Sequence, residues 1–167
     1  MINIGGFLYY FSSSGLALTL IRIVIFGISP NNILAEVFRR RMAGIGKSIE
    51  VPRNDEMGLA SLSLTSDDLA ILISYSGKLL QFPPRLLEHL EYSEVTTLAI
   101  TSQEKSPLAQ FCDIVLPISG REQIVGKISG FASEESILFI LNVLYAAYFS
   151  LNYDANLAYK QKMAELL

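Results

Sequence analysis

One stretch of the sequence reads Asp67-Asp68-Leu69-Ala70-Ile71-Leu72-Ile73-Ser74-Tyr75-Ser76-Gly77-Lys78. Its apolar run has no polar interruption, which is typical of a strand that is covered on both faces of a parallel sheet. The run ends abruptly in two serines, a tyrosine, a glycine and a lysine. The stretch therefore predicts a buried central strand that leads into a polar loop.

Other apolar runs occur on both sides of this strand along the chain, at 23–26, 48–51, 96–100 and 114–116. Segments with helical spacing separate them, at 33–45, 57–64 and around 86–90. Ser106-Pro107 predicts a capped start for a short fourth helix, and Ser133 is expected to cap the last helix. This alternation predicts an α/β fold with a five-stranded parallel sheet in the order 2-1-3-4-5.

In that strand order the chain reverses direction between strands 1 and 3, and ligands bind outside the carboxyl ends of these strands. The rule directs attention to the loops at 27–32 and 74–80, which are rich in hydroxyls, amides and glycine. Ser74, Ser76 and the amides freed at Gly77 could form a concave set of donors for a phosphate, with Lys78 adding charge. An ordinary loop, in which the two serines only cap the next helix, explains the same residues. The residues alone leave both interpretations open.

Composition excludes several classes of protein. The 167 residues are 51% hydrophobic and 17% charged, which excludes an intrinsically disordered chain. The net charge of −3 argues against nucleic-acid binding by the chain itself. One cysteine and one histidine exclude an internal disulfide and a Cys/His zinc cluster, and a reducing cytoplasm is the expected setting.

Two segments are so apolar that packing against one small sheet cannot bury all of their side chains. Residues 1–21 carry no charge, and we expect a buried helix there, with a membrane anchor as the alternative. The last helix is apolar on all sides, which indicates a subunit interface. We predict a single domain over 1–167, with the apolar helix at 1–21, a core at 22–150 and a helical tail at 151–167.

At this point the sequence resembles a known family. Ile73-Ser74-Tyr75-Ser76-Gly77, Leu98-Ala99-Ile100-Thr101, Ser106-Pro107-Leu108-Ala109 and Asp113-Ile114-Val115-Leu116 are similar to the SIS (sugar isomerase) domain. The resemblance covers about residues 22–150. The wording of the motifs is most similar to the sugar-phosphate-sensing domain of RpiR-type transcriptional regulators.

The resemblance implies a three-layer flavodoxin-like fold, a homodimer or dimer of dimers built through helices, and a phosphosugar pocket at the strand ends. It implies no membrane association and a cytoplasmic location. DNA would be contacted only through a segment that this chain lacks. By position, the implied ligand-binding residues are Ser29, Asn31, Ser74, Tyr75, Ser76, Gly77 and Lys78, with no catalytic residue, metal or cofactor.

Three features depart from the family pattern. Ser29 and Asn31 stand where glycine and serine are usual, and Leu79 replaces a threonine that would offer a hydroxyl to the phosphate. Pro83-Pro84 is expected in the second turn of the third helix, where it would distort the helix axis. These departures also fit a dimerisation scaffold with a degenerate pocket.

A phosphosugar isomerase is the other alternative, and it requires a base from Glu122, Glu134 or Glu135 to face the pocket. We expect these carboxylates to complement the dipole of the last helix instead. His89 is interpreted as a surface residue, and Cys112 as a small buried hydrophobe. Arg39-Arg40-Arg41 is interpreted as complementing the end of its helix.

Overall fold

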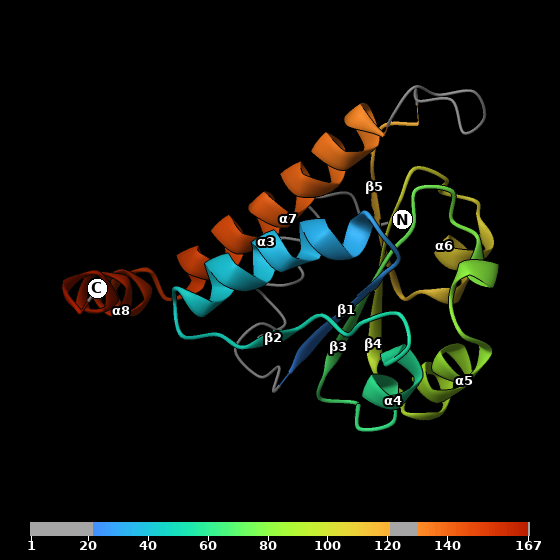
Figure 1. The fold of residues 1–167 in the computed structure, drawn as a ribbon, viewed down its shortest axis with the longest axis horizontal. Coiled ribbons are helices and arrows are strands. Elements are labelled where there is room, and N and C mark those ends of the chain that lie inside the picture. Colours follow the sequence, from blue (N-terminus) through green and yellow to red (C-terminus); the bar gives the residue numbers. More distant parts are fainter. Residues whose placement is uncertain (1–21, 121–129, 167) are drawn as a thin grey trace.

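Apolar strands form a parallel sheet in the order β2-β1-β3-β4-β5, as predicted (Figure 1). This computed structural model describes residues 22–120 and 130–166. The strands are β1 (Ile23–Gly27), β2 (Ile49–Glu50), β3 (Leu69–Ile73), β4 (Thr96–Thr101) and β5 (Ile114–Pro117).

Helices cover both faces of this sheet, giving three layers (Figure 1). On one face lie α3 (Asn31–Ala43) and α7 (Phe131–Leu151), which pack against each other. On the other face lie α4 (Met57–Ser61), α5 (Pro84–Tyr92) and the single-turn α6 (Pro107–Phe111). A 3-10 turn, η1 (Leu79–Gln81), precedes α5, and α8 (Tyr153–Glu165) extends from the end of α7.

The uninterrupted apolarity of β3 follows from this double cover. Leu69, Ile71 and Ile73 belong to the core under α3 and α7, whereas Ala70 and Leu72 belong to the core under α4, α5 and α6. Side chains of a strand alternate between the two faces, so both sets of β3 side chains are buried and both are apolar.

The central pairing places the polar loops together. Gly27, the last residue of β1, pairs with Ile73, the last residue of β3. The loops after these strands therefore begin at the same edge of the sheet. The strand order reverses there, and the sequence-based expectation for a ligand site falls at this point.

The prediction for the double proline is wrong. Leu79–Gln81 forms a separate 3-10 turn, and α5 begins at Pro84, with extended backbone at Pro83. A proline in the first turn of a helix removes no helical hydrogen bond, because that N–H has no partner within the helix. The prolines thus start α5 instead of distorting it.

Of the two helix caps predicted from the sequence, one is confirmed and the other is wrong. The Ser106 hydroxyl accepts the Ala109 N–H at 3.2 Å, so it caps α6 as expected. The last helix, however, begins at Phe131 with Gly130 before it, and the Ser133 hydroxyl donates to the Gly130 carbonyl at 2.9 Å. Ser133 therefore lies inside the first turn, where its hydroxyl bonds backward and does not cap.

Helix α7 buries only one side against the sheet and α3. Its buried residues include Ile137, Leu141 and Leu144, whereas Phe139 is 62% exposed on another side. By length and composition α7 could cross a membrane, although a core helix of a soluble protein meets the same criterion. The expectation for a helix at 1–21 concerns residues outside the described part of the chain.

Candidate functional site

A cavity of about 310 Å³ opens at the carboxyl ends of β1 and β3, and we call it the switch-point cavity. Three parts of the chain meet around it: the start of α3, the loop after β3 and the start of α7. Its lining consists of Pro30, Asn31, Tyr75, Ser76, Gln81, Gly130, Ser133 and Glu134. Of the residues predicted for the site, the lining includes Asn31, Tyr75 and Ser76.

Gly77 forces the turn that presents Ser76. Its φ of +66° lies in the left-handed region, which side chains disfavour. The Gly77 N–H donates to the Ser74 hydroxyl at 3.0 Å. A Cβ atom at Gly77 would lie 2.1 Å from the Ser106 Oγ, so the loop packs directly on the start of α6. The glycine is therefore required by conformation and by space.

Strand β4 fixes the same loop from its other side. The Tyr75 carbonyl accepts the Ser102 hydroxyl at 2.7 Å and the Ser102 N–H at 3.2 Å. The Thr101 hydroxyl also donates to it at 3.3 Å. The backbone at Tyr75 is thus held from the end of β4, which leaves the neighbouring Ser76 at the cavity wall.

Asn31 joins the two loops that the strand order brings together. Its Nδ2 donates to the Ile73 carbonyl, the last of β3, at 3.2 Å. The bond uses one amide donor of a side chain whose residue lines the cavity. Asn31 also begins α3, so the bond fixes the start of this helix against β3.

Gln81 is a cavity residue that the sequence analysis did not single out. Its Nε2 is buried and has no hydrogen-bond partner within the described residues. Buried donors almost always have a partner, so an unpartnered one on a residue that lines a cavity is unusual. No sequence signal marks Gln81, because its position depends on the 3-10 turn that returns the chain to the cavity.

The other predicted residues lie around the cavity and not in its lining. Ser29 and Lys78 are exposed. Ser74 is fully buried, and its hydroxyl holds the Gly77 N–H. Leu79 faces a different hollow, between α5 and α6. A ligand role stays a prediction for Ser29, Ser74, Gly77 and Lys78, and for Asn31, Tyr75 and Ser76 in the lining.

One of the three carboxylates considered for an isomerase reaches the cavity. Glu134, half-buried in the first turn of α7, is part of the lining. A Cβ atom at Gly130 would lie 2.8 Å from the Glu134 Oε1, so the carboxylate packs over this glycine. Glu135 faces another hollow, and Glu122 lies outside the described residues.

Residues with reactive side chains elsewhere lie apart from the cavity. Burial raises the pKa of the Cys112 thiol to about 12, which keeps it protonated at neutral pH. The His89 Nδ1 lies 3.0 Å from the hydroxyl of the buried Ser61, which ties α5 to α4. Arg40 and Arg41 occupy the last turn of α3, as predicted. No cluster of metal-ligating side chains occurs in residues 22–120 and 130–166.

A comparison of the sequence with models of protein families shows which family the chain belongs to. The profile of the SIS domain matches residues 21–150, which is most of the chain. The chain belongs to the SIS domain family. Among curated proteins, an uncharacterized HTH-type transcriptional regulator of Haemophilus influenzae is 29% identical over 149 residues. That match covers 87% of this SIS chain and 50% of the regulator, so the chain spans about half the length of its relative.

Solved structures share the fold of this SIS domain. The Vibrio vulnificus NanR protein complexed with ManNAc-6P superposes with a TM-score of 0.77 at 17% identity, covering 95% of this chain and 59% of NanR. The sugar isomerase domain of an RpiR transcription factor from Sphaerobacter thermophilus gives 0.70 at 16% identity, covering 92% and 84%. Proteins described as sugar-phosphate isomerases share the fold as well. At these identities the likeness shows the fold alone.

Proposed function

We propose that this SIS domain senses a sugar phosphate and belongs to an RpiR-type transcriptional regulator. The observation that carries the proposal is the switch-point cavity, whose lining includes Ser76 and Gln81, the latter with a buried Nε2 that has no hydrogen-bond partner among the described residues. Its volume of about 310 Å³ is at the lower end of the range for small-molecule sites, about 300–1,000 Å³, and fits one phosphorylated monosaccharide. The bound ManNAc-6P in the NanR structure supports the same class of ligand.

In this proposal the cavity residues divide the ligand between them. Ser76 and Gln81 donate hydrogen bonds to phosphate oxygens, and the charged acceptor strengthens these bonds. Asn31 and Glu134 contact hydroxyls of the sugar, because a carboxylate accepts from hydroxyls and repels a phosphate. Ser74 and Gly77 shape the loop from behind, and Lys78 adds positive charge at its exposed end.

The domain would act as a homodimer or dimer of dimers in the cytoplasm. The outer side of α7, with its exposed Phe139, offers an apolar surface for a second copy. DNA would be contacted through the half of the regulator that lies outside the matched region, in the manner of the HTH-type relative. A ligand that binds two dimer arrangements unequally would shift the balance between them.

A phosphosugar isomerase is the second candidate, and one observation favours it. Glu134 is the carboxylate that lines the cavity, which is the condition that a proton-transferring base must meet. Aldose–ketose conversion moves a proton between adjacent carbons of the sugar. A single protein carboxylate that contacts both carbons, here that of Glu134, can perform this transfer. Incubation of a bound sugar phosphate with the protein decides between the candidates, since a sensor returns the ligand unchanged.

A thermal-shift screen with sugar phosphates, including ManNAc-6P, tests the proposed function. A ligand at 100 times its Kd should stabilise the fold by about 2.7 kcal/mol. Ser76→Ala should weaken binding about 10- to 150-fold, because a hydrogen bond to a charged group contributes about 1.5–3 kcal/mol. Ser48→Ala is the matched control, since Ser48 is exposed and precedes β2 at the opposite edge of the sheet.

Two results would contradict the proposal. If no sugar phosphate raises the melting temperature, the scaffold with a degenerate pocket becomes the better account. If binding is the same in Ser76→Ala and Ser48→Ala, the ligand binds outside the switch-point cavity.

A further inference from the structure

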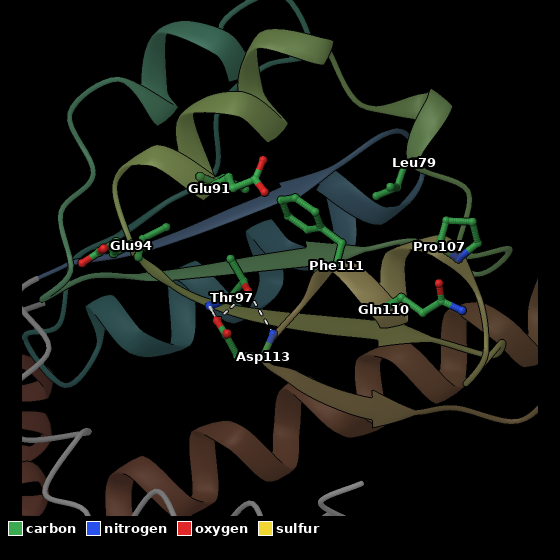
Figure 2. A pocket seen from close by; sticks show the side chains of 10 residues that line it. Leu79, Glu91, Glu94, Thr97, Pro107, Gln110, Phe111 and Asp113 are labelled. Atoms are coloured by element: carbon green, nitrogen blue, oxygen red, sulfur yellow. Dashed lines mark hydrogen bonds between the residues drawn. The ribbon is translucent and has the colours of Figure 1, made fainter.

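A second and larger hollow lies on the face of the sheet that α4, α5 and α6 cover, between α5 and α6 above the start of β4 (Figure 2). Its volume is about 690 Å³. It exists because α6 is a single turn and leaves the sheet beside α5 partly uncovered. We call it the acidic groove, and its lining is Leu79, Leu90, Glu91, Glu94, Val95, Thr97, Pro107, Gln110, Phe111 and Asp113.

The floor and the rim of the acidic groove differ in character. Leu90 and Val95 are buried at its base, and the half-buried Phe111 extends across it toward α5 (Figure 2). Glu91 and Glu94, in contrast, are exposed on the rim. An apolar floor with a polar, charged rim is the usual anatomy of a protein-binding surface.

The charge on this rim has one sign. Asp113 is exposed at the end of the groove, and its Oδ2 accepts the Thr97 N–H at 2.8 Å and the Thr97 hydroxyl at 2.7 Å. Within the described residues, neither Asp113 nor the two glutamates form an ion pair, since the ion pairs there involve Glu36, Glu50, Asp55 and Glu56. The groove therefore presents uncompensated negative charge around an apolar floor, which complements a cationic partner.

The acidic groove shares a wall with the switch-point cavity. Ser76, in the loop after β3, and Gln81, in η1, line the cavity, whereas Leu79, also in η1, lines the groove. The same loop holds α6, because the Gly77 carbonyl accepts the Leu108 N–H at 3.0 Å. Pro107, Gln110 and Phe111 of α6 line the groove. One loop thus forms part of both sites, and a ligand that moves it changes the shape of the groove.

We propose that the acidic groove docks a lysine- or arginine-flanked apolar segment from the DNA-binding half of the regulator. The inference rests on the proposed function. The HTH-type relative is about twice as long as the matched region, and DNA-binding segments are rich in Lys and Arg. Residues 1–21 carry no charge and so do not complement the rim. Apolar side chains of the docked segment cover Leu79 and Phe111, and its cations face Glu91, Glu94 and Asp113.

A synthetic peptide tests the docking. The probe is an 18-residue helical peptide with leucines on one side and lysines flanking them, and a second peptide has glutamates in place of the lysines. Fluorescence anisotropy measures the binding of each peptide to the whole chain. The lysine peptide should bind at least tenfold more tightly than the glutamate peptide. In Glu91→Lys its affinity should fall at least tenfold, because the reversed charge faces the peptide.

Glu88→Lys provides the matched control. Glu88 is exposed on the same helix but does not line the groove. The variant changes the charge by the same amount as Glu91→Lys. Its affinity for the lysine peptide should stay within twofold of the unaltered chain. Equal loss in both variants, or equal binding of both peptides, would overturn the docking proposal. So would the absence of binding at millimolar peptide.

Failure of the docking proposal can be distinguished from failure of the sensing function. If the screen fails but the peptide distinguishes Glu91→Lys from Glu88→Lys, the groove is a docking site and the sensing function is wrong. If the screen succeeds and the peptide does not distinguish them, the sensing function stands without this docking site.

Discussion

At the scale of single residues, Glu94 on the rim of the acidic groove has a strained backbone conformation. Its φ of 52° places it in the left-handed region just after α5. Glycine or asparagine usually occupies this position after a helix, because a Cβ atom costs about 1–2 kcal/mol there. A docking role for the carboxylate accounts for a side chain at a position where the backbone favours none.

Glu94→Gly should therefore stabilise the chain. The relief of backbone strain, less the extra entropy of the unfolded glycine, leaves about 0.5–1 kcal/mol, or about 1–4 °C in Tm. Differential scanning calorimetry measures the change. Glu88→Gly is the control, because a glycine inside α5 should destabilise the chain by about 1 kcal/mol. A Tm that falls in Glu94→Gly would show that the Glu94 side chain stabilises the fold, contrary to this account.

At the scale of elements, the loop between β3 and η1 connects the two sites. Gly77 makes this connection, since it packs on Ser106 at the start of α6 and its carbonyl holds the Leu108 N–H. A change at Gly77 should consequently affect the fold, the cavity and the groove together.

Gly77→Ala should destabilise the chain by about 2–5 kcal/mol. The left-handed backbone accounts for about 1–2 kcal/mol, and the overlap of the new Cβ with Ser106 accounts for about 1–3 kcal/mol. Urea unfolding measures the loss. Gly58→Ala is the matched control, because no atom lies within 4 Å of its Cβ position in α4, and alanine there should be neutral or stabilising. Equal stability of the two variants would mean that the loop adjusts freely and does not fix α6.

The same elements show what the sequence could predict. The apolar runs located the five strands of the described residues, because strands covered on both faces are mostly apolar. The strand order then placed Asn31 and Ser76 at one edge of the sheet. Gln81 could not be predicted, because its orphaned Nε2 depends on how the 3-10 turn packs in space. The start of α5 at Pro84 differs from the prediction, because the sequence does not show that the turn at 79–81 is separate from the helix.

At the scale of the whole molecule, the cavity at the carboxyl ends of β1 and β3 and the groove between α5 and α6 share one connection, which runs from β3 through η1. Ser76 faces the switch-point cavity and Leu79 faces the acidic groove. Ser76 and Leu79 lie three residues apart, and Gly77 between them contacts Ser106 at the start of α6. This short connection is the reason to expect that the occupant of one site changes the affinity of the other.

A sugar phosphate that binds in the thermal-shift screen should change the Kd of the lysine peptide by about fivefold or more, in the lower part of the usual range of coupling between sites. By thermodynamic linkage, saturating peptide must change the Kd of the sugar phosphate by the same factor. Titrations of each ligand with and without the other, by calorimetry, measure both factors. In Ser76→Ala, sugar phosphate at a concentration near its Kd for the unaltered chain should change the peptide Kd much less, because the weaker binding leaves the cavity mostly empty. A peptide Kd that is identical with and without bound sugar phosphate would show that the shared loop is rigid and that the groove does not report on the cavity.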